Sequence, residues 1–336
     1  MRTREAVIAA LADELERDNR VILLGEDIAE AGGAFKATEG LKARFGANRV
    51  RDTPISEMGF LGAGVGAAAT GLRPVVEMMF VEFIGVALDQ LTTEACKLHF
   101  LSRGQLRVPL TVRASAGAGL GFGCQHSQML DQWFRGTSGL SVVIPSNPQT
   151  AYGLLRSAIQ NDDPTVVLET RSLYAERDEV VLGIEGIVPL GKAAVLQAGT
   201  DVTVLAAGQM VRVARKACFD AGWSVELIDL QTLVPWDRAT ILESVSRTRR
   251  LVIVEESPAS GGWGSEIANV VNGELFGELD APVHRITLPD VPVPYASSLE
   301  SKFLPGPEYV KDQIDEYMTT NRCPQPWWLR DGGLAS

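Results

Sequence analysis

The chain has few histidines and few cysteines for its 336 residues. The three histidines, His99, His126 and His284, contain no pair at the spacing of metal ligands. The cysteines are far apart and match no metal-ligand spacing either: Cys96, Cys124, Cys218 and Cys323. The sequence therefore gives no sign of a zinc site, and we expect buried or free thiols in a reducing compartment.

Long apolar runs and blocks of positive charge are also missing. No run reaches the roughly 20 residues of a membrane span, and residues 1–5 lead into an amphipathic helix without the apolar segment of a signal peptide. The net charge of −11, with no basic block and no interleaved aromatic stripe, argues against a nucleic-acid surface. We therefore expect a cytoplasmic globular protein that binds neither membrane nor nucleic acid.

The chain is too long for one ordinary core and suits two α/β domains. Short apolar runs typical of buried parallel strands are found at residues 21–24, 73–80, 108–113, 140–145 and 165–169, and again at 202–206, 224–229, 251–255 and 283–287. Segments with helical spacing alternate with them: 6–17, 38–45, 83–102, 149–160, 210–221, 238–246, 265–276 and 308–318. This alternation predicts two parallel sheets, each covered by helices on both faces in a three-layer arrangement.

Composition also suggests where the domains meet. The segment 174–191 is less apolar and more charged than its flanks, so we divide the chain into domains at 1–185 and 186–322. The remaining tail, 323–336, holds two prolines and the adjacent Trp327 and Trp328. Paired tryptophans on such a tail favour an interface arm.

A glycine-rich loop follows the strand at 108–113. The loop, 114–123, lacks the Gly-Lys-Ser/Thr ending of a phosphate loop and opens no obvious helix, so it matches no nucleotide fingerprint. It ends in Gln125-His-Ser-Gln128, on the side of the sheet where α/β proteins place ligands. His126 is thus a candidate for proton transfer as well as for loop structure, whereas His99 and His284 are simplest as structural or surface residues.

Glu57 is the carboxylate around which the first half is organised. It follows Ser56, a residue type that caps helices, and precedes a long run of small residues that starts at Leu61. In the first helical turn it is either an acid stabilised by the helix macrodipole or a partly buried carboxylate that holds a proton for a cofactor.

An ordered set of motifs carries a family resemblance. In the first half they are Gly25-Glu-Asp27, Asp52–Phe60, Gly71–Glu77, Asp89-Gln90, Gln125–Gln128 and Gly139–Pro145. In the second half they are Asp229–Pro235, Glu255-Glu256, Gly261–Ile267, Asp290–Pro294 and Leu299-Glu300. Over residues 3–320 the chain resembles the β subunits of the E1 components of pyruvate, branched-chain 2-oxoacid and acetoin dehydrogenase complexes, which depend on thiamine diphosphate.

The resemblance implies a pyrimidine-binding domain followed by a transketolase C-terminal-like domain, and it implies roles for single residues. Glu57 matches the glutamate that hydrogen-bonds N1′ of the cofactor's aminopyrimidine, a role that needs surroundings able to hold a proton on the carboxyl. Phe83 matches the aromatic residue stacked on the pyrimidine, and Met79 falls near the same ring. His126 matches a histidine at the mouth of the active site that stabilises charge or relays protons.

The resemblance also implies metal sites and partners. Four positions fall where some family members bind K⁺, mostly through backbone oxygens: Leu110, Ala158, Asn161 and Asp163. The Gly-Asp-Gly motif with which thiamine enzymes begin their Mg²⁺ and diphosphate site does not occur in this sequence. A separate α subunit is therefore expected to supply it, in an α2β2 heterotetramer with the cofactor between α and β.

The leading hypothesis is an E1 β subunit that takes part in decarboxylating a 2-oxoacid and in passing the acyl group to a lipoyl-E2. A two-component transketolase-like enzyme that passes a two-carbon unit to a carrier-protein thiol is an alternative, and a non-catalytic scaffold chain is another. Departures from the usual pattern, such as Glu82 near the usual Asp and Gln231 in place of Arg, leave the 2-oxoacid open.

Overall fold

Tertiary contacts divide the chain into two units in the computed structural model, which describes residues 1–219 and 221–330. The first unit is made of Met1–Gly117, Gln125–Gly191 and Thr232–Pro235. The second is made of Ala118–Cys124, Lys192–Gln231 and the chain from Trp236 on. Part of the glycine-rich loop therefore groups with the second unit although it lies in the middle of the first in sequence.

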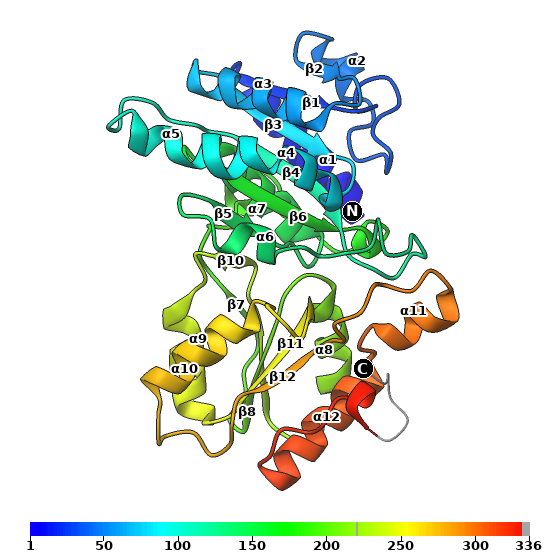
Figure 1. The fold of residues 1–336 in the computed structure, drawn as a ribbon, viewed down its shortest axis with the longest axis vertical. Helices are drawn as coiled ribbons and strands as arrows, with labels where there is room; N and C mark the ends of the chain where they lie inside the picture. The colour runs from blue at the N-terminus through cyan, green and yellow to red at the C-terminus, as the bar shows by residue number, and fades with distance from the viewer. Residues whose placement is uncertain (220, 331–336) are drawn as a thin grey trace. The chain divides into compact units, whose positions relative to one another are not determined.

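The first unit is built on a seven-stranded sheet (Figure 1). Its strands are β1 (Val21–Gly25), β2 (Val50–Asp52), β3 (Arg73–Met78), β4 (Thr111–Ala116), β5 (Ser141–Val143), β6 (Thr165–Thr170) and β10 (Thr232–Val234), in the order β10-β5-β6-β4-β3-β1-β2. All neighbours are parallel except β10, which pairs antiparallel with β5. The sequence predicts the parallel strands other than β2 but misses β2 and β10, which are three residues each and too short to show a pattern of their own.

Helices cover both faces of this sheet. They are α1 (Thr3–Arg17), α2 (Leu41–Phe45), α3 (Glu57–Ala69), α4 (Ile84–Asp89), α5 (Cys96–Leu101), α6 (Gln132–Arg135) and α7 (Pro148–Gln160). The apolar stripe of α1 packs on α7 in a core that includes Leu11 and Tyr152. On the other face α3 lies close to β3, because Gly64 has no side chain to meet Val76, whose Cγ2 would be 2.8 Å from an added Cβ. The long helix predicted at 83–102 is interrupted by a π-helical segment at Gln90–Ala95.

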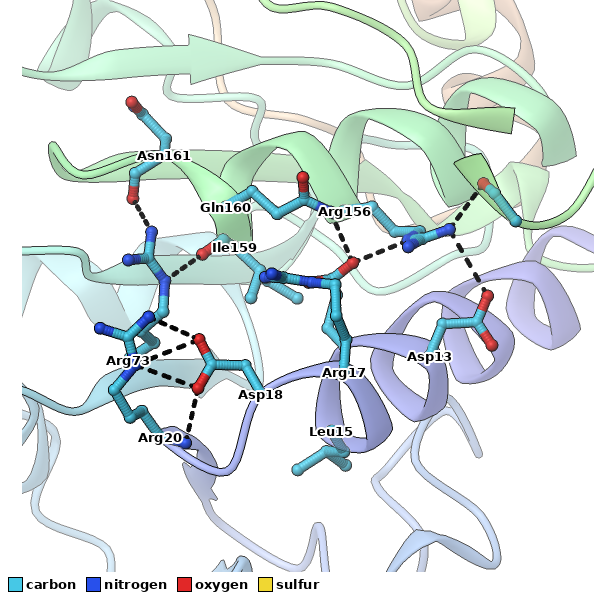
Figure 2. Close-up of polar contacts among 12 residues, drawn as sticks. Asp13, Leu15, Arg17, Asp18, Arg20, Arg73, Arg156, Ile159, Gln160 and Asn161 are labelled. Carbon is cyan, nitrogen blue, oxygen red and sulfur yellow. Dashed lines mark hydrogen bonds and ion pairs between the residues drawn. The ribbon is translucent and has the colours of Figure 1, made fainter. Parts of the chain in front are cut away.

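Polar contacts fix α7 to its neighbours (Figure 2). The buried carboxylate of Glu14 in α1 accepts hydrogen bonds from Arg156 (2.8 Å) and Gln160 (2.7 Å). At the end of α7, the guanidinium of Arg73 donates to the carbonyl oxygens of Ile159 (2.8 Å) and Asn161 (2.6 Å), as Figure 2 shows. A cation at a helix C-terminus is favourable because the last carbonyls carry the negative end of the macrodipole.

The second unit has a five-stranded sheet in the order β12-β11-β8-β9-β7. Its strands are β7 (Ala194–Gln197), β8 (Val202–Ala206), β9 (Val225–Asp229), β11 (Leu251–Pro258) and β12 (His284–Leu288). Its helices are α8 (Gln209–Phe219), α9 (Arg238–Thr248), α10 (Gly264–Glu274), α11 (Ser297–Phe303) and α12 (Pro307–Thr320). The edge strand β7 pairs antiparallel with β9, which the prediction of a wholly parallel sheet missed. The short helix α11 was also missed.

The predicted tail begins in the described part of the chain. Its Trp327 and Trp328 rings meet edge to face, and the Trp327 N–H donates to the Tyr309 hydroxyl at 3.3 Å. Residues 331–336 lie outside the described residues. Within the ranges that the structure describes, no helix combines the length and the apolar character needed to cross a bilayer.

Candidate functional site

The parallel strands of the first unit end at one edge of the sheet, as their register shows. Gly25 of β1 pairs with Asp52 of β2 and with Glu77 of β3, while Ala116 of β4 pairs with Thr170 of β6. The segments that leave this edge contain the predicted site residues and their neighbours: Glu26, Thr53–Glu57, Met79–Phe83, Gly117 and Arg171. In open α/β sheets this edge is where ligands bind.

Glu57 is the first residue of α3, as the sequence predicts. Its side chain is partly exposed, and the neighbouring Met58 and Ile55 are exposed at 56% and 85%, whereas Phe60 and Leu61 are buried. Ser56 is the N-cap residue, as expected, but its side chain makes no capping hydrogen bond. The start of α3 and the residue before its cap thus present a carboxylate and two apolar side chains at the surface of this unit.

Glu26 is a second carboxylate at the same edge, and sequence analysis did not single it out. Burial raises its pKa, and the negative charges of Glu57 and Asp27 raise it further. Its Oε1 is buried and has no hydrogen-bond partner among the residues described. The signal was a polar residue directly after the buried strand β1. Glu26 therefore keeps its proton more readily than an exposed glutamate does.

Aromatic rings surround His126. Its imidazole stacks on Phe80, with ring centroids 4.4 Å apart and an interplanar angle of 23°, and meets Phe83 edge to face at 5.5 Å. Phe80 and Phe83 are themselves in edge contact at 5.5 Å. The Nδ1 of His126 is buried and unpartnered within the described chain. The structure therefore brings together Phe83 and His126, which are 43 positions apart in sequence.

Arg171, which the sequence analysis missed, fastens the segment that presents His126. The guanidinium donates to the backbone oxygens of Gly117 (2.9 Å) and His126 and to the Ser115 hydroxyl (3.2 Å). It also lies over the Phe80 ring, 4.9 Å from the centroid. Because it follows β6 directly and is buried, Arg171 can gather the ends of β4 and of the loop after it.

Met79 lies at the end of β3 over a buried ionic cluster. Its backbone oxygen accepts the hydroxyl hydrogen of Ser115, and its side chain is partly buried. Below it Arg113 donates to Glu169 through Nε (2.8 Å) and Nη2 (2.7 Å) and also pairs with Glu77. Burial raises the pKa of Glu77, and Arg113 opposes that shift. These ion pairs link β3, β4 and β6 next to Met79.

The four predicted K⁺ ligands lie close to one another at the end of α7. The Leu110 oxygen accepts the amide hydrogen of Thr165 (2.9 Å), and the Ala158 oxygen accepts that of Asn161 (3.3 Å). The Asn161 side chain donates to the Asp163 oxygen at 3.1 Å. In the part of the chain that the structure describes, histidine, cysteine and acidic side chains form no group of three that could hold a metal.

Comparisons with known proteins agree with this architecture. The model "Transketolase, pyrimidine binding domain" matches residues 1–177, and "Transketolase, C-terminal domain" matches residues 191–310. Pyruvate dehydrogenase E1 component subunit beta of Rhizobium meliloti is 42% identical over 94% of this chain and 69% of that protein. 2-oxoisovalerate dehydrogenase subunit beta of Pseudomonas aeruginosa is 42% identical over 91% of each.

A solved structure adds support for the fold alone. A split gene transketolase in an inactive beta4 tetramer matches with a TM-score of 0.77 at 23% identity, over 95% of this chain and 99% of the other. The predicted fold class and the predicted family are thereby confirmed. The chain belongs to the family of E1 β subunits of 2-oxoacid dehydrogenases.

Proposed function

We propose that this chain is the β subunit of an E1 that uses thiamine diphosphate to decarboxylate a 2-oxoacid and passes the acyl group to a lipoyl-E2. The observation that carries the proposal is the placement of Glu57 at the same sheet edge as the Phe83–His126 cluster, within the segment that matches a pyrimidine-binding domain. Pyruvate and 2-oxoisovalerate, named in the relatives, define the class of acid.

The residues at this edge fit an aminopyrimidine. Such a ring offers polar nitrogens at its rim and an aromatic face. The chain offers matching groups. Glu26 and His126 have buried polar atoms without a partner in the described residues, and Phe83 has an aromatic ring. When bound, thiamine diphosphate would supply a nucleophilic ring carbon and a sink for the electron pair of decarboxylation.

The chain's own residues then have separate tasks. Glu57 would hydrogen-bond N1′ of the aminopyrimidine, with Glu26 as a second carboxyl at the same sheet edge. Phe83 stacks on the pyrimidine, and Met79 lies beside the ring. His126, held between aromatic rings, stabilises charge and moves a proton when the acyl group leaves.

We further propose that an α subunit completes the site in an α2β2 assembly. It would bring Mg²⁺ and the diphosphate pocket, whose Gly-Asp-Gly motif this sequence lacks. The exposed Ile55 and Met58 give the surface beside Glu57 the apolar character of a subunit contact. The free cysteines accord with the reducing environment of a cytoplasm.

We also propose a K⁺ site at the backbone oxygens of Leu110, Ala158, Asn161 and Asp163. Carbonyl oxygens suit a hard cation, and four of them come from one region at the end of α7. These oxygens already accept hydrogen bonds, however, including one at Asn161 from the Arg73 guanidinium. A bound K⁺ would have to share them. The chain's melting temperature in KCl, compared with that in NaCl, tests for this site, since a bound ion stabilises the fold.

The test is reconstitution of this chain with an α-type partner that carries Gly-Asp-Gly, assayed for 2-oxoacid-dependent reduction of lipoamide. We expect Glu57→Gln to lower turnover by about 10²- to 10⁴-fold, the usual range for removing a group that transfers a proton. Glu94→Gln, on an exposed side chain, is the matched control. Undiminished turnover of Glu57→Gln would support the alternative of a non-catalytic scaffold chain. Transfer of a two-carbon unit without lipoamide reduction would support the transketolase-like alternative.

A further inference from the structure

Glu82 lies in the short 3₁₀ turn Val81–Phe83. The residues on either side of this acid supply the two rings that meet the imidazole: Phe80 stacks on it, and Phe83 meets its edge. No role follows for Glu82 from the proposed chemistry. Its position nevertheless places a carboxyl between the two aromatic contacts of the histidine.

One oxygen of Glu82 holds the backbone just after His126. Oε1 accepts the amide hydrogen of Gln128 at 2.8 Å. The carbonyl oxygen of Gln128 in turn accepts the amide hydrogen of Gly117 at 3.0 Å. Gln128 is therefore held through both its amide hydrogen and its carbonyl oxygen, and the His126 backbone is held by Arg171 two residues earlier.

The other oxygen of Glu82 and the Nδ1 of His126 are both buried, and neither has a hydrogen-bond partner in the described part of the chain. Leaving such atoms unpaired is costly, so two of them in one cluster need an explanation. They are complementary, because a carboxylate accepts and a charged imidazole donates from Nδ1. The charged groups that face Glu82 are His126 and Arg171.

We propose that Glu82 is the positioning residue of His126: Oε1 clamps the loop at Gln128, and Oε2 receives the Nδ1 hydrogen when the imidazole carries a proton. This rests on the proposed function only in that His126 works at the active site. The clamp fixes where the ring lies between Phe80 and Phe83. The second oxygen stabilises the protonated ring, so the histidine keeps a proton that it can deliver.

Electrostatics support this second task. Burial raises the pKa of Glu82, while the Gln128 amide and the charges of Arg171 and His126 work against that shift. The attraction between Glu82 and His126 is reciprocal, since a carboxylate that is stabilised by an imidazolium stabilises the imidazolium equally. Removing the charge at Glu82 should therefore make His126 lose its proton at lower pH.

Two variants of the full chain in its complex with the α subunit separate the clamp from the charge. Glu82→Gln keeps an oxygen that can accept from Gln128 but removes the charge, and Glu82→Ala removes both. Glu94→Gln is the control. Hydrogen exchange at the Gln128 amide reports the clamp. Acylation of His126 by diethylpyrocarbonate as a function of pH, read by peptide mass spectrometry, reports the charge, with the buried His284 as an unreactive internal reference.

We expect Glu82→Ala to speed exchange at Gln128 by about tenfold or more, the effect of losing one charge-assisted hydrogen bond, and Glu82→Gln to leave it nearly unchanged. We expect Glu82→Gln to lower the pH of half-maximal acylation of His126 by about one unit. Unchanged exchange in Glu82→Ala overturns the clamp. An unchanged pH profile of His126 acylation in Glu82→Gln overturns the charge role. If Glu82→Ala does not fold, this acylation profile alone tests the proposal. Neither readout needs 2-oxoacid turnover, so each stands apart from the Glu57→Gln assay.

Discussion

At the scale of single residues, Arg171 shows how one buried cation orders the candidate site. Its planar guanidinium reaches Ser115, Gly117 and His126 at once and also lies over the Phe80 ring. A guanidinium can do this because its donors point in fixed, divergent directions and its face stacks on an aromatic ring. The ammonium of lysine has neither property.

We therefore expect Arg171→Lys to be damaging although it keeps the charge. Unsatisfied backbone oxygens and lost stacking should lower the free energy of unfolding by about 1 to 3 kcal/mol, and a displaced His126 should lower turnover by about tenfold. Thermal unfolding and the reconstituted lipoamide assay measure the two effects. Arg103→Lys, on an exposed side chain, is the control. Equal stability of the two variants would show that Arg171 is replaceable by any cation.

The site residues that the sequence predicts and those that it does not indicate differ in a physical way. Glu57, Phe83 and His126 stand in short motifs that can be recognised within a few positions of chain. Glu82 and Arg171 act through partners 46 and 45 residues away, and neither has a local pattern that predicts them. Their importance is visible only once the strand ends are brought to one edge of the sheet.

At the scale of elements, the middle of the glycine-rich loop is fastened by acids of the second unit. Glu256 of β11 accepts the Ala118 amide hydrogen (2.7 Å), and Glu300 of α11 accepts those of Gly119 (2.8 Å) and Gly121 (2.9 Å). Both carboxylates are buried. A single carboxylate that receives two amide hydrogens from a loop with positive φ at both glycines fixes the loop's shape.

We expect Glu300→Ala to loosen this loop. Exchange at the Gly119 and Gly121 amides should rise by about 10- to 100-fold as two charge-assisted hydrogen bonds are lost. In Glu300→Gln, the exchange rate of these amides should lie between that of Glu300→Ala and that of the parent chain. Peptide-resolved hydrogen exchange on the full chain makes the measurement, with the exposed Glu308→Ala as control. Exchange that does not change in Glu300→Ala would mean that packing alone, without Glu300, holds the loop.

Sequence patterns predict this fold where elements are long and periodic, and fail where stability comes from distant contacts. The buried strands and amphipathic helices of both sheets were predicted because burial imposes a period on them. The loop was left without a role because its acceptors lie 138 to 181 residues away. The edge strands β7 and β10 were missed because each is short and is held in its sheet by pairing with only one neighbouring strand.

At the scale of the whole molecule, buried titratable groups make stability depend on pH in two directions. Glu26, Glu77 and Glu82 have raised pKa values, so the folded chain binds their protons more tightly than the unfolded chain does. Their contribution is therefore present at low pH and lost as pH rises. His284 acts in the opposite sense, because burial lowers its pKa to about 4.

His284 should dominate the loss of stability of the second unit in mild acid. The unfolded chain binds a proton at His284 near pH 6.5 and the folded chain only near 4, so unfolding becomes easier as pH falls through that window. Inside the fold the neutral ring faces Gln313 (3.2 Å) and stacks on Tyr317 (5.7 Å). Between pH 7.5 and 5 the linkage amounts to about 2 kcal/mol.

Urea titration at pH 7.5 and at pH 5 measures how far the free energy of unfolding falls between these two pH values. We expect the fall in His284→Gln to be about 2 kcal/mol smaller than the fall in the parent chain. The variant starts lower at pH 7.5, because a glutamine fills the site less well and cannot stack on Tyr317. His99→Gln, in the first unit, should follow the parent at both pH values. Parallel losses in the parent and in His284→Gln would assign the acid sensitivity of the second unit to other groups.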